Sequence, residues 1–144
     1  MIKESKTYSL LIDTEPLIKL FSKEKGWEAV QKILLRIESG DIEAAISVIT
    51  LTEINNKYLH EKREDLAKAR IEALKYATYL KKIGVDEKIA VKAGEFKGKY
   101  RIPIANSLIS ASAFSINAIV ISNDADFKKI TEIQVMDEAD FFDE

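Results

Sequence analysis

The chain has 144 residues, of which 47% are hydrophobic and 32% charged, so it has enough apolar sequence to bury one core. It contains no cysteine, which excludes a disulfide framework and thiolate metal sites. The formal net charge of −2 argues against a protein that coats nucleic acid. With no targeting segment and no membrane-spanning run evident, we expect a single cytoplasmic domain over residues 1–144.

Apolar runs alternate with helical patterns in the first half of the chain. Residues 7–13 predict a buried strand that ends in an acid, and residues 44–50 predict a second buried strand. Two helices separate them, one capped by Thr14 and one that ends at Gly40. This alternation is typical of βαβ units and a parallel sheet.

The second half continues the alternation, which predicts a mostly parallel sheet covered by helices on both faces. Sites in such folds form beyond the carboxyl ends of the strands. The remaining predicted elements are helices from Thr52 and over 65–82, a short strand over 83–86, helices over 87–100 and from Pro103, and strands over 118–122 and 133–137.

Five polar residues are expected at that edge of the sheet: Asp13, Glu53, Asn106, Asp124 and Asp126. Each also has an ordinary structural interpretation, as a helix cap, a first-turn acid or an Asx-turn. Unrelated caps need not meet at one edge of one sheet, so their convergence favours a common site.

Carboxylates that crowd together repel one another unless a cation lies between them. An all-oxygen cluster suits Mg²⁺ or Mn²⁺ rather than zinc, and two such ions can promote hydrolysis of a phosphodiester. The single histidine, His60, lies in a polar helical stretch without a nucleophile elbow, so no Ser-His-Asp site competes with this hypothesis.

Four segments in order resemble the PIN domain, and in size the chain most resembles a VapC-type toxin of a toxin–antitoxin pair. "LLIDTEPLIKLF" is similar to the first family motif, and "ISVITLTEI" to the second, with Ser47 and Thr50 in their usual places. "IPIANSLISASAF" is similar to the third motif, and "IVISNDADF" to the fourth.

This resemblance implies a three-layer α/β/α PIN-like domain with a central, mostly parallel sheet. It implies a hydrolase that binds Mg²⁺ or Mn²⁺ and cleaves single-stranded RNA, a homodimer, and a small antitoxin whose C-terminal segment enters the acidic groove. The implied metal ligands are Asp13, Glu53, Asp124 and Asp126, with Asn106 as a poorer member of the catalytic set.

Asn106 departs from the family pattern, which places Asp at this position. An amide keeps an acceptor oxygen but lacks the negative charge, so we expect weakened metal binding and reduced cleavage. A capping or core amide remains an alternative interpretation of Asn106.

Residues 57–82 contain eight Lys or Arg against four acids, a balance that permits phosphate contact but also describes a solvated helix face. The residues expected to contact the substrate are Ser47, Thr50, Asn56, Lys57, Lys99 and Arg101.

Two rival interpretations remain open. A PIN-like domain that has lost catalysis could bind RNA or protein, and Asn106 supports that alternative. A response-regulator-like receiver also gathers acids at strand ends, but "LLIDTEP" and "IQVMDEA" supply neither its acid pair nor its lysine. The last segment, "EADFFDE", is expected to be a partner-binding tail or a disordered end.

Overall fold

The computed structural model describes residues 9–143, so the first two residues of the strand expected over 7–13 lie outside it. Five strands form one sheet in the order β3-β2-β1-β4-β5, and every neighbouring pair is parallel. The mostly parallel sheet is therefore confirmed. The strands are β1 (Ser9–Ile12), β2 (Glu43–Ser47), β3 (Leu80–Ile83), β4 (Ile119–Ile121) and β5 (Gln134–Met136).

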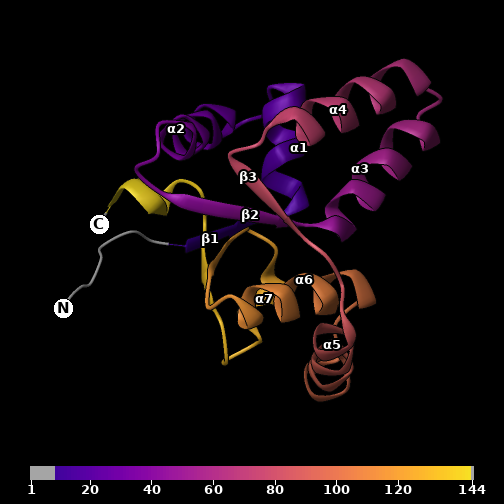
Figure 1. Cartoon of the computed structure of the whole chain (residues 1–144), viewed down its shortest axis with the longest axis vertical. Coiled ribbons are helices and arrows are strands. Elements are labelled where there is room, and N and C mark those ends of the chain that lie inside the picture. Colours follow the sequence, from indigo (N-terminus) through magenta and orange to yellow (C-terminus); the bar gives the residue numbers. More distant parts are fainter. Residues whose placement is uncertain (1–8, 144) are drawn as a thin grey trace.

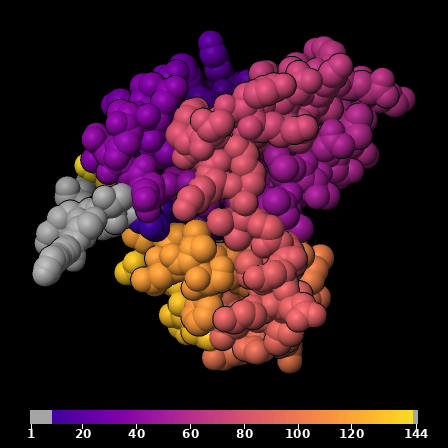
Figure 2. Space-filling view, in the orientation of Figure 1, coloured from indigo at the N-terminus to yellow at the C-terminus, as the bar shows by residue number. Residues whose placement is uncertain are grey.

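Helices cover both faces of this sheet, which confirms the three-layer α/β/α architecture (Figure 1). In Figure 1, α1–α4 lie on one side of the strands and α5–α7 on the other. Figure 2 shows the same division on the surface, with α4 above and α5 below. The helices are α1 (Thr14–Ser22), α2 (Trp27–Glu38), α3 (Val48–His60), α4 (Glu64–Tyr76), α5 (Glu87–Tyr100), α6 (Ile104–Ser115), α7 (Ala125–Lys128) and the 3₁₀-helix η1 (Asp140–Asp143).

The central strand β1 is buried on both faces, as its uninterrupted apolar sequence predicts. Its side chains alternate between two clusters because successive residues of a strand point to opposite faces. Leu10 and Ile12 pack with α1, α2, α3 and α4, while Leu11 packs with α6 and α7. Strand β1 therefore anchors both layers.

The order in which strands are added to the sheet reverses at β1. Strand β2 lies on one side of it and β4 on the other, so β1 and β4 flank the point where an open α/β sheet binds ligands. The N–H of Asp13 donates to the carbonyl of Ile121 at 3.1 Å. This bond fixes the first acidic residue beside the end of β4.

Several predicted boundaries are wrong, including the start of the helix expected from Thr52, which begins at Val48. The second strand ends at Ser47 rather than at residue 50, because the Ser47 side chain caps α3 by accepting from the N–H of Ile49. The helix expected over 65–82 ends at Tyr76, and the third strand is 80–83 rather than 83–86. Sequence spacing alone could not separate that helix from the following strand, because so few apolar residues fit the repeat of a helix and that of a strand equally well.

The C-terminal segment is folded through residue 143, so the predicted disordered end is wrong, while its role as a partner-binding tail stays a prediction. Glu138 is 3% exposed, and Phe141 packs against the cluster formed by β1 and α1–α4. The segment therefore belongs to the folded domain.

Across residues 9–143, the structure contains no helix with the length and apolar character needed to cross a membrane.

We predict that Phe127→Ala will destabilise the fold, because this ring is 0% exposed and anchors α7 to the second cluster. The expected loss is about 3–5 kcal/mol in the free energy of unfolding by urea. Tyr76→Ala is the matched control, since Tyr76 is 79% exposed and should change stability by less than about 0.5 kcal/mol. Equal losses in the two variants would contradict the assignment of Phe127 to the core.

Candidate functional site

Asp13 lies at the end of β1 and immediately before α1. It occupies the cap position of that helix, but its side chain makes no cap hydrogen bond. Its carboxylate instead accepts a 2.8 Å hydrogen bond from the hydroxyl of Ser122, which follows β4. Asp13 is 5% exposed, so the interpretation of this residue as an ordinary helix cap does not hold.

Burial raises the pKa of Asp13 from 3.8 to about 6, although hydrogen bonds from Ser122 and the Thr14 backbone act in the opposite direction. The negative charges of Glu53 and Asp124 raise this pKa further. The three carboxyl groups therefore influence one another electrostatically.

Glu53 reaches the same place from α3. The Thr14 hydroxyl donates to Glu53 Oε1 at 2.5 Å and also lies 3.0 Å from the Thr50 hydroxyl. Thr14 thus joins α1 to α3 beside Asp13. The prediction that Thr14 caps α1 is wrong, because Asp13 occupies the cap position. The hydroxyl directly after the first acid was the available signal for the role of Thr14 beside Glu53.

Ser47 and Thr50 support the site from beneath. Ser47 caps α3, and both side chains are 0% exposed. The expectation that they contact substrate is therefore wrong, because no surface of either residue is open to it. Their hydroxyls instead hold α3, and with it Glu53.

Asn106 lies in the first turn of α6, after Pro103 has set the extended entry to that helix. Its amide nitrogen donates to Asp124 Oδ2 at 3.2 Å. The amide is therefore neither a cap nor a core residue, but a neutral donor to one of the carboxylates.

Asp124 precedes α7 and is held by three groups. Its Oδ1 accepts from the N–H of Asp126 at 2.9 Å, its Oδ2 accepts from Asn106, and its own N–H donates to the Ser122 hydroxyl at 3.0 Å. Ser122 consequently links Asp124 to Asp13. Ser122 was not among the predicted site residues, although a hydroxyl directly after a buried strand at this sheet edge was a usable signal.

One cavity of about 290 Å³ is lined by Asp13, Glu53, Asn106 and Asp124, which come from separate parts of the chain. The lining residues are Asp13, Thr14, Glu15, Ile18, Glu53, Asn56, Lys57, Asn106 and Asp124.

Asp126 is not among these lining residues. Its carboxylate pairs with Lys129 Nζ at 3.0 Å, one helical turn away. The structure therefore does not bring Asp126 into the site, and its expected role as a metal ligand lacks support. Its backbone N–H still orients Asp124.

The basic residues differ in position. Lys57 lines the cavity with Asn56, and its ammonium donates to Glu61 at 2.7 Å, which raises the pKa of Lys57. Lys99 instead contacts Glu132 at 3.4 Å, and Arg101 ends α5 with a φ of 56°. Neither Lys99 nor Arg101 lines the cavity, so of these four expected contacts only Asn56 and Lys57 lie at it.

The types of donor fit a hard divalent cation, because Asp13, Glu53 and Asp124 present carboxylate oxygens to one cavity. The arrangement fits less well: among residues 9–143, no three Asp, Glu, His or Cys side chains form a group that could hold a metal ion. The Asn106 amide donates to Asp124 where an additional carboxylate would otherwise favour a cation.

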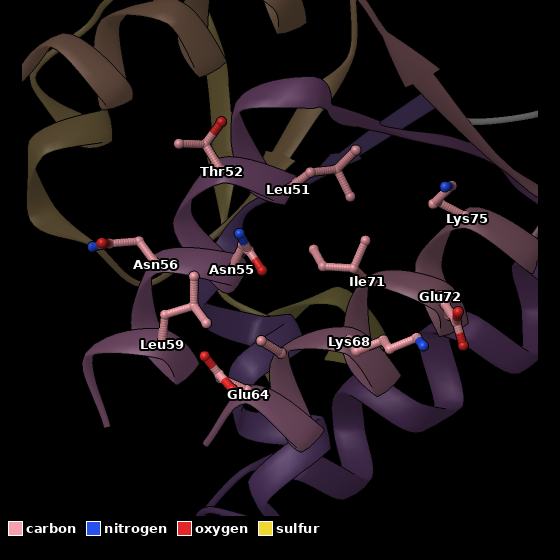
Figure 3. Close-up of a pocket in the computed structure, with 11 residues that line it drawn as sticks. Leu51, Thr52, Asn55, Asn56, Leu59, Glu64, Lys68, Ile71, Glu72 and Lys75 are labelled. Carbon is pink, nitrogen blue, oxygen red and sulfur yellow. The ribbon is translucent and has the colours of Figure 1, made fainter. Parts of the chain in front are cut away.

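A second and larger concavity of about 810 Å³ lies between α3 and α4 (Figure 3). Leu51, Leu59 and Ile71 supply its apolar surface, and Figure 3 shows Ile71 pointing toward Leu51. Asn56 lines both this groove and the acidic cavity, so the two are adjacent. The charged residues on its rim are Glu64, Lys68, Glu72 and Lys75.

Comparison with known proteins places this architecture. The model of the PIN domain family matches residues 10–133, and the chain belongs to that family. Proteins of this family are typically nucleases, and they generally use divalent metal ions.

Solved structures of toxin–antitoxin complexes share the fold. A chain of VapBC2 from Rickettsia felis, bound to a promoter DNA fragment, is 19% identical, with 90% of this chain and 98% of that chain covered and a TM-score of 0.75. A chain of DNA-bound VapBC from Salmonella typhimurium is 18% identical, with 92% of this chain and 99% of that chain covered and a TM-score of 0.73. A chain of a toxin–antitoxin complex from Klebsiella pneumoniae is 23% identical, with 90% of this chain and 97% of that chain covered and a TM-score of 0.65. A search of curated protein sequences gave no match.

We predict that Asp13→Asn will stabilise the metal-free protein in a pH-dependent way. The folded pKa of about 6 lies above the ordinary 3.8, so the folded chain retains a proton that the unfolded chain releases between these values. The unfolding free energy contributed by Asp13 therefore falls as pH rises through that window and stays low above it.

The variant should gain about 2 kcal/mol near pH 7.5 and almost nothing near pH 4, as measured by urea unfolding with EDTA. An equal change at both pH values would show that desolvation of the charged form is not the cause.

Proposed function

We propose that this PIN domain is a metal-dependent endoribonuclease of the VapC toxin type, and that Asn106 weakens it. The observation that carries the proposal is the convergence of Asp13, Glu53 and Asp124 on one cavity from β1, α3 and the start of α7. Three acids separated by tens of residues have no structural need to meet, and their charges oppose the meeting.

Asp13, Glu53 and Asp124 are the proposed ligands of Mg²⁺ or Mn²⁺, and binding would require the ion to draw these carboxylates closer together, because among residues 9–143 they do not form a group that could hold a metal ion. A divalent cation supplies Lewis-acid polarisation of the phosphoryl oxygens and a nucleophilic water at neutral pH. The chain's own groups prepare this site: Ser122 orients Asp13, Thr14 orients Glu53, and Asn106 orients Asp124.

RNA is the proposed substrate because the positively charged side chain of Lys57 lies at the acidic cavity. Lys57 and Asn56 lie on α3 at the cavity lining, where an ammonium and an amide can hold a phosphate. The pairing of Lys57 with Glu61 keeps this ammonium charged, and a phosphate can compete for it. Cleavage should therefore weaken as salt concentration rises.

A PIN-like module that binds RNA or protein without catalysis is the second candidate. The donation from Asn106 to Asp124 favours it, because this contact satisfies a carboxylate without a metal ion. Calorimetric titration with Mn²⁺ separates the two candidates, since a non-catalytic module has no requirement to bind the ion.

A small antitoxin is the proposed partner, and the α3–α4 groove is its proposed docking site. The fold is shared with chains from toxin–antitoxin complexes. An apolar floor between two helices suits the apolar face of a partner helix, and Asn56 connects the groove to the acidic cavity. A partner segment that leaves the groove at this point would reach the carboxylates. The homodimer and the cytoplasmic location remain predictions.

We predict that Asn106→Asp will strengthen both metal binding and cleavage. The additional charge is worth up to about 4 kcal/mol before desolvation and screening, so we expect the affinity for Mn²⁺ to rise by roughly tenfold or more. Single-turnover cleavage of a single-stranded RNA pool should rise with it.

Asn55→Asp is the matched control, because Asn55 lies on α3 and lines the groove rather than the acidic cavity. If Asn106→Asp and Asn55→Asp behave alike in both assays, position 106 is not part of a metal site. If wild type and Asn106→Asp both bind Mn²⁺ without cleaving RNA, the nuclease proposal fails.

We predict that Ile71→Lys will weaken binding of the proposed antitoxin by at least about tenfold, because it places a charge in the apolar floor of the groove. Val91→Lys on α5 is the control, since Val91 is 66% exposed and does not line the groove. Calorimetry on both folded variants measures the effect, and equal affinities would place the partner elsewhere.

A further inference from the structure

A buried ion pair joins α1 to the segment that follows β5, in the layer that contains α1–α4. Lys19 of α1 donates to Glu138 Oε2 at 2.7 Å across 119 residues of sequence. The side chains are only 13% and 4% exposed. Of the ion pairs formed within residues 9–143, this is the most buried, and the proposed catalytic chemistry does not use it.

The backbone between α1 and α2 is shaped around this pair. Gly26 has a φ of +98°, and a Cβ at this position would lie 3.1 Å from Glu138 Oε2 and 3.7 Å from Lys19 Nζ. A side chain here would be strained by the positive φ and would crowd the carboxylate. Glycine at position 26 therefore suits both the positive φ and the close approach of the Glu138 carboxylate.

A second contact holds the same C-terminal segment against α2. The guanidinium of Arg36 lies 5.8 Å from the centroid of the Phe141 ring, and Phe141 packs edge to face with Phe142 at 5.1 Å. Glu138 is therefore presented by a segment that is fixed on both sides, by β5 before it and by η1 after it.

The buried ion pair contributes little net stability for the hydration that its two charges lose. Two charges lose their hydration on burial, and packed apolar side chains of the same size usually do as well or better. The remaining oxygen of Glu138, Oε1, is buried without a hydrogen-bond partner among the described residues. A geometric role explains its presence better than a stabilising one.

Helix α1 is the element that such a role would serve. Thr14, Glu15 and Ile18 of this helix line the acidic cavity, and Asp13 directly precedes it. Lys19 lies in its last turn. The helix is held at its start by the bond from Thr14 to Glu53 and near its end by the bond to Glu138.

We propose that Glu138 is a positioning residue: by fixing Lys19, it sets the axial position of α1 and thereby the placement of Asp13 and Thr14 in the acidic cavity. In its effect on catalysis, this inference rests on the proposed nuclease function. The C-terminal segment is thus part of the site's support, although it lies outside the cavity.

Glu138→Gln tests the proposal, because it keeps the shape of the side chain and removes its charge. Rates are measured at a temperature where the variant and wild type are both fully folded. Loss of position at the reacting groups should lower kcat for RNA cleavage by roughly tenfold or more, with KM little changed because Asn56 and Lys57 lie on α3. Lys19→Arg retains the ion pair and should stay close to wild type.

Glu95→Gln is the matched control, since it removes the same charge from the exposed pair with Lys92. Equal kcat values for Glu138→Gln and Glu95→Gln, or a loss in Glu138→Gln that appears only in KM, would overturn the positioning role.

A second measurement does not depend on activity. Amide hydrogen exchange of α1 should be faster in Glu138→Gln than in wild type, while that of α5 stays unchanged. The emission of Trp27, the single tryptophan and the first residue of α2, should shift with it.

If wild type cleaves no RNA while exchange in α1 still responds to Glu138→Gln, the nuclease proposal fails and the support of α1 by Glu138 stands. If exchange in α1 matches wild type, the support itself is refuted, whatever the cleavage rates.

Discussion

Mutual repulsion among carboxylates is the constraint around which this molecule is organised. Asp13, Glu53 and Asp124 share one cavity, and burial together with the other two charges raises the pKa of Asp13 to about 6. Three hydroxyl or amide donors offset part of this cost, because Ser122, Thr14 and Asn106 each donate to one carboxylate. The sheet, the two flanking layers and the caps of α3 and α7 hold these groups together against their charge.

Asn106 gives this arrangement a neutral hydrogen-bond donor to Asp124. A carboxylate at this position would add a fourth negative charge and increase the need for a cation, whereas the amide donates a hydrogen bond to Asp124. The chain can therefore keep an ordered acidic cavity in the absence of metal.

The surroundings of the cavity connect it to distant parts of the chain. On one side, Asn56 joins it to the apolar groove between α3 and α4, where a partner could approach the carboxylates. On the other, α1 runs from the cavity to the buried pair of Lys19 and Glu138. Lys19 and Glu138 are 119 residues apart in sequence, so the proposed support of α1 comes from a contact that no local motif contains.

The sequence by itself determined the alternation of apolar strands and helices, the parallel sheet, and the set of acids at its carboxyl edge, because each follows from local periodicity and from where the strands end. The strand and helix boundaries predicted from sequence were wrong at residues 48–50 and 77–82, because β-branched or mixed runs there satisfy the spacing of either a strand or a helix.

Only the tertiary structure decided which polar residues meet. Asp126 turns to Lys129, Ser47 and Thr50 are covered, and Ser122 joins Asp13 to Asp124. It also decided that Glu138 is buried with Lys19. Contacts between residues far apart in sequence depend on how the layers pack, and spacing along one segment carries no information about that packing.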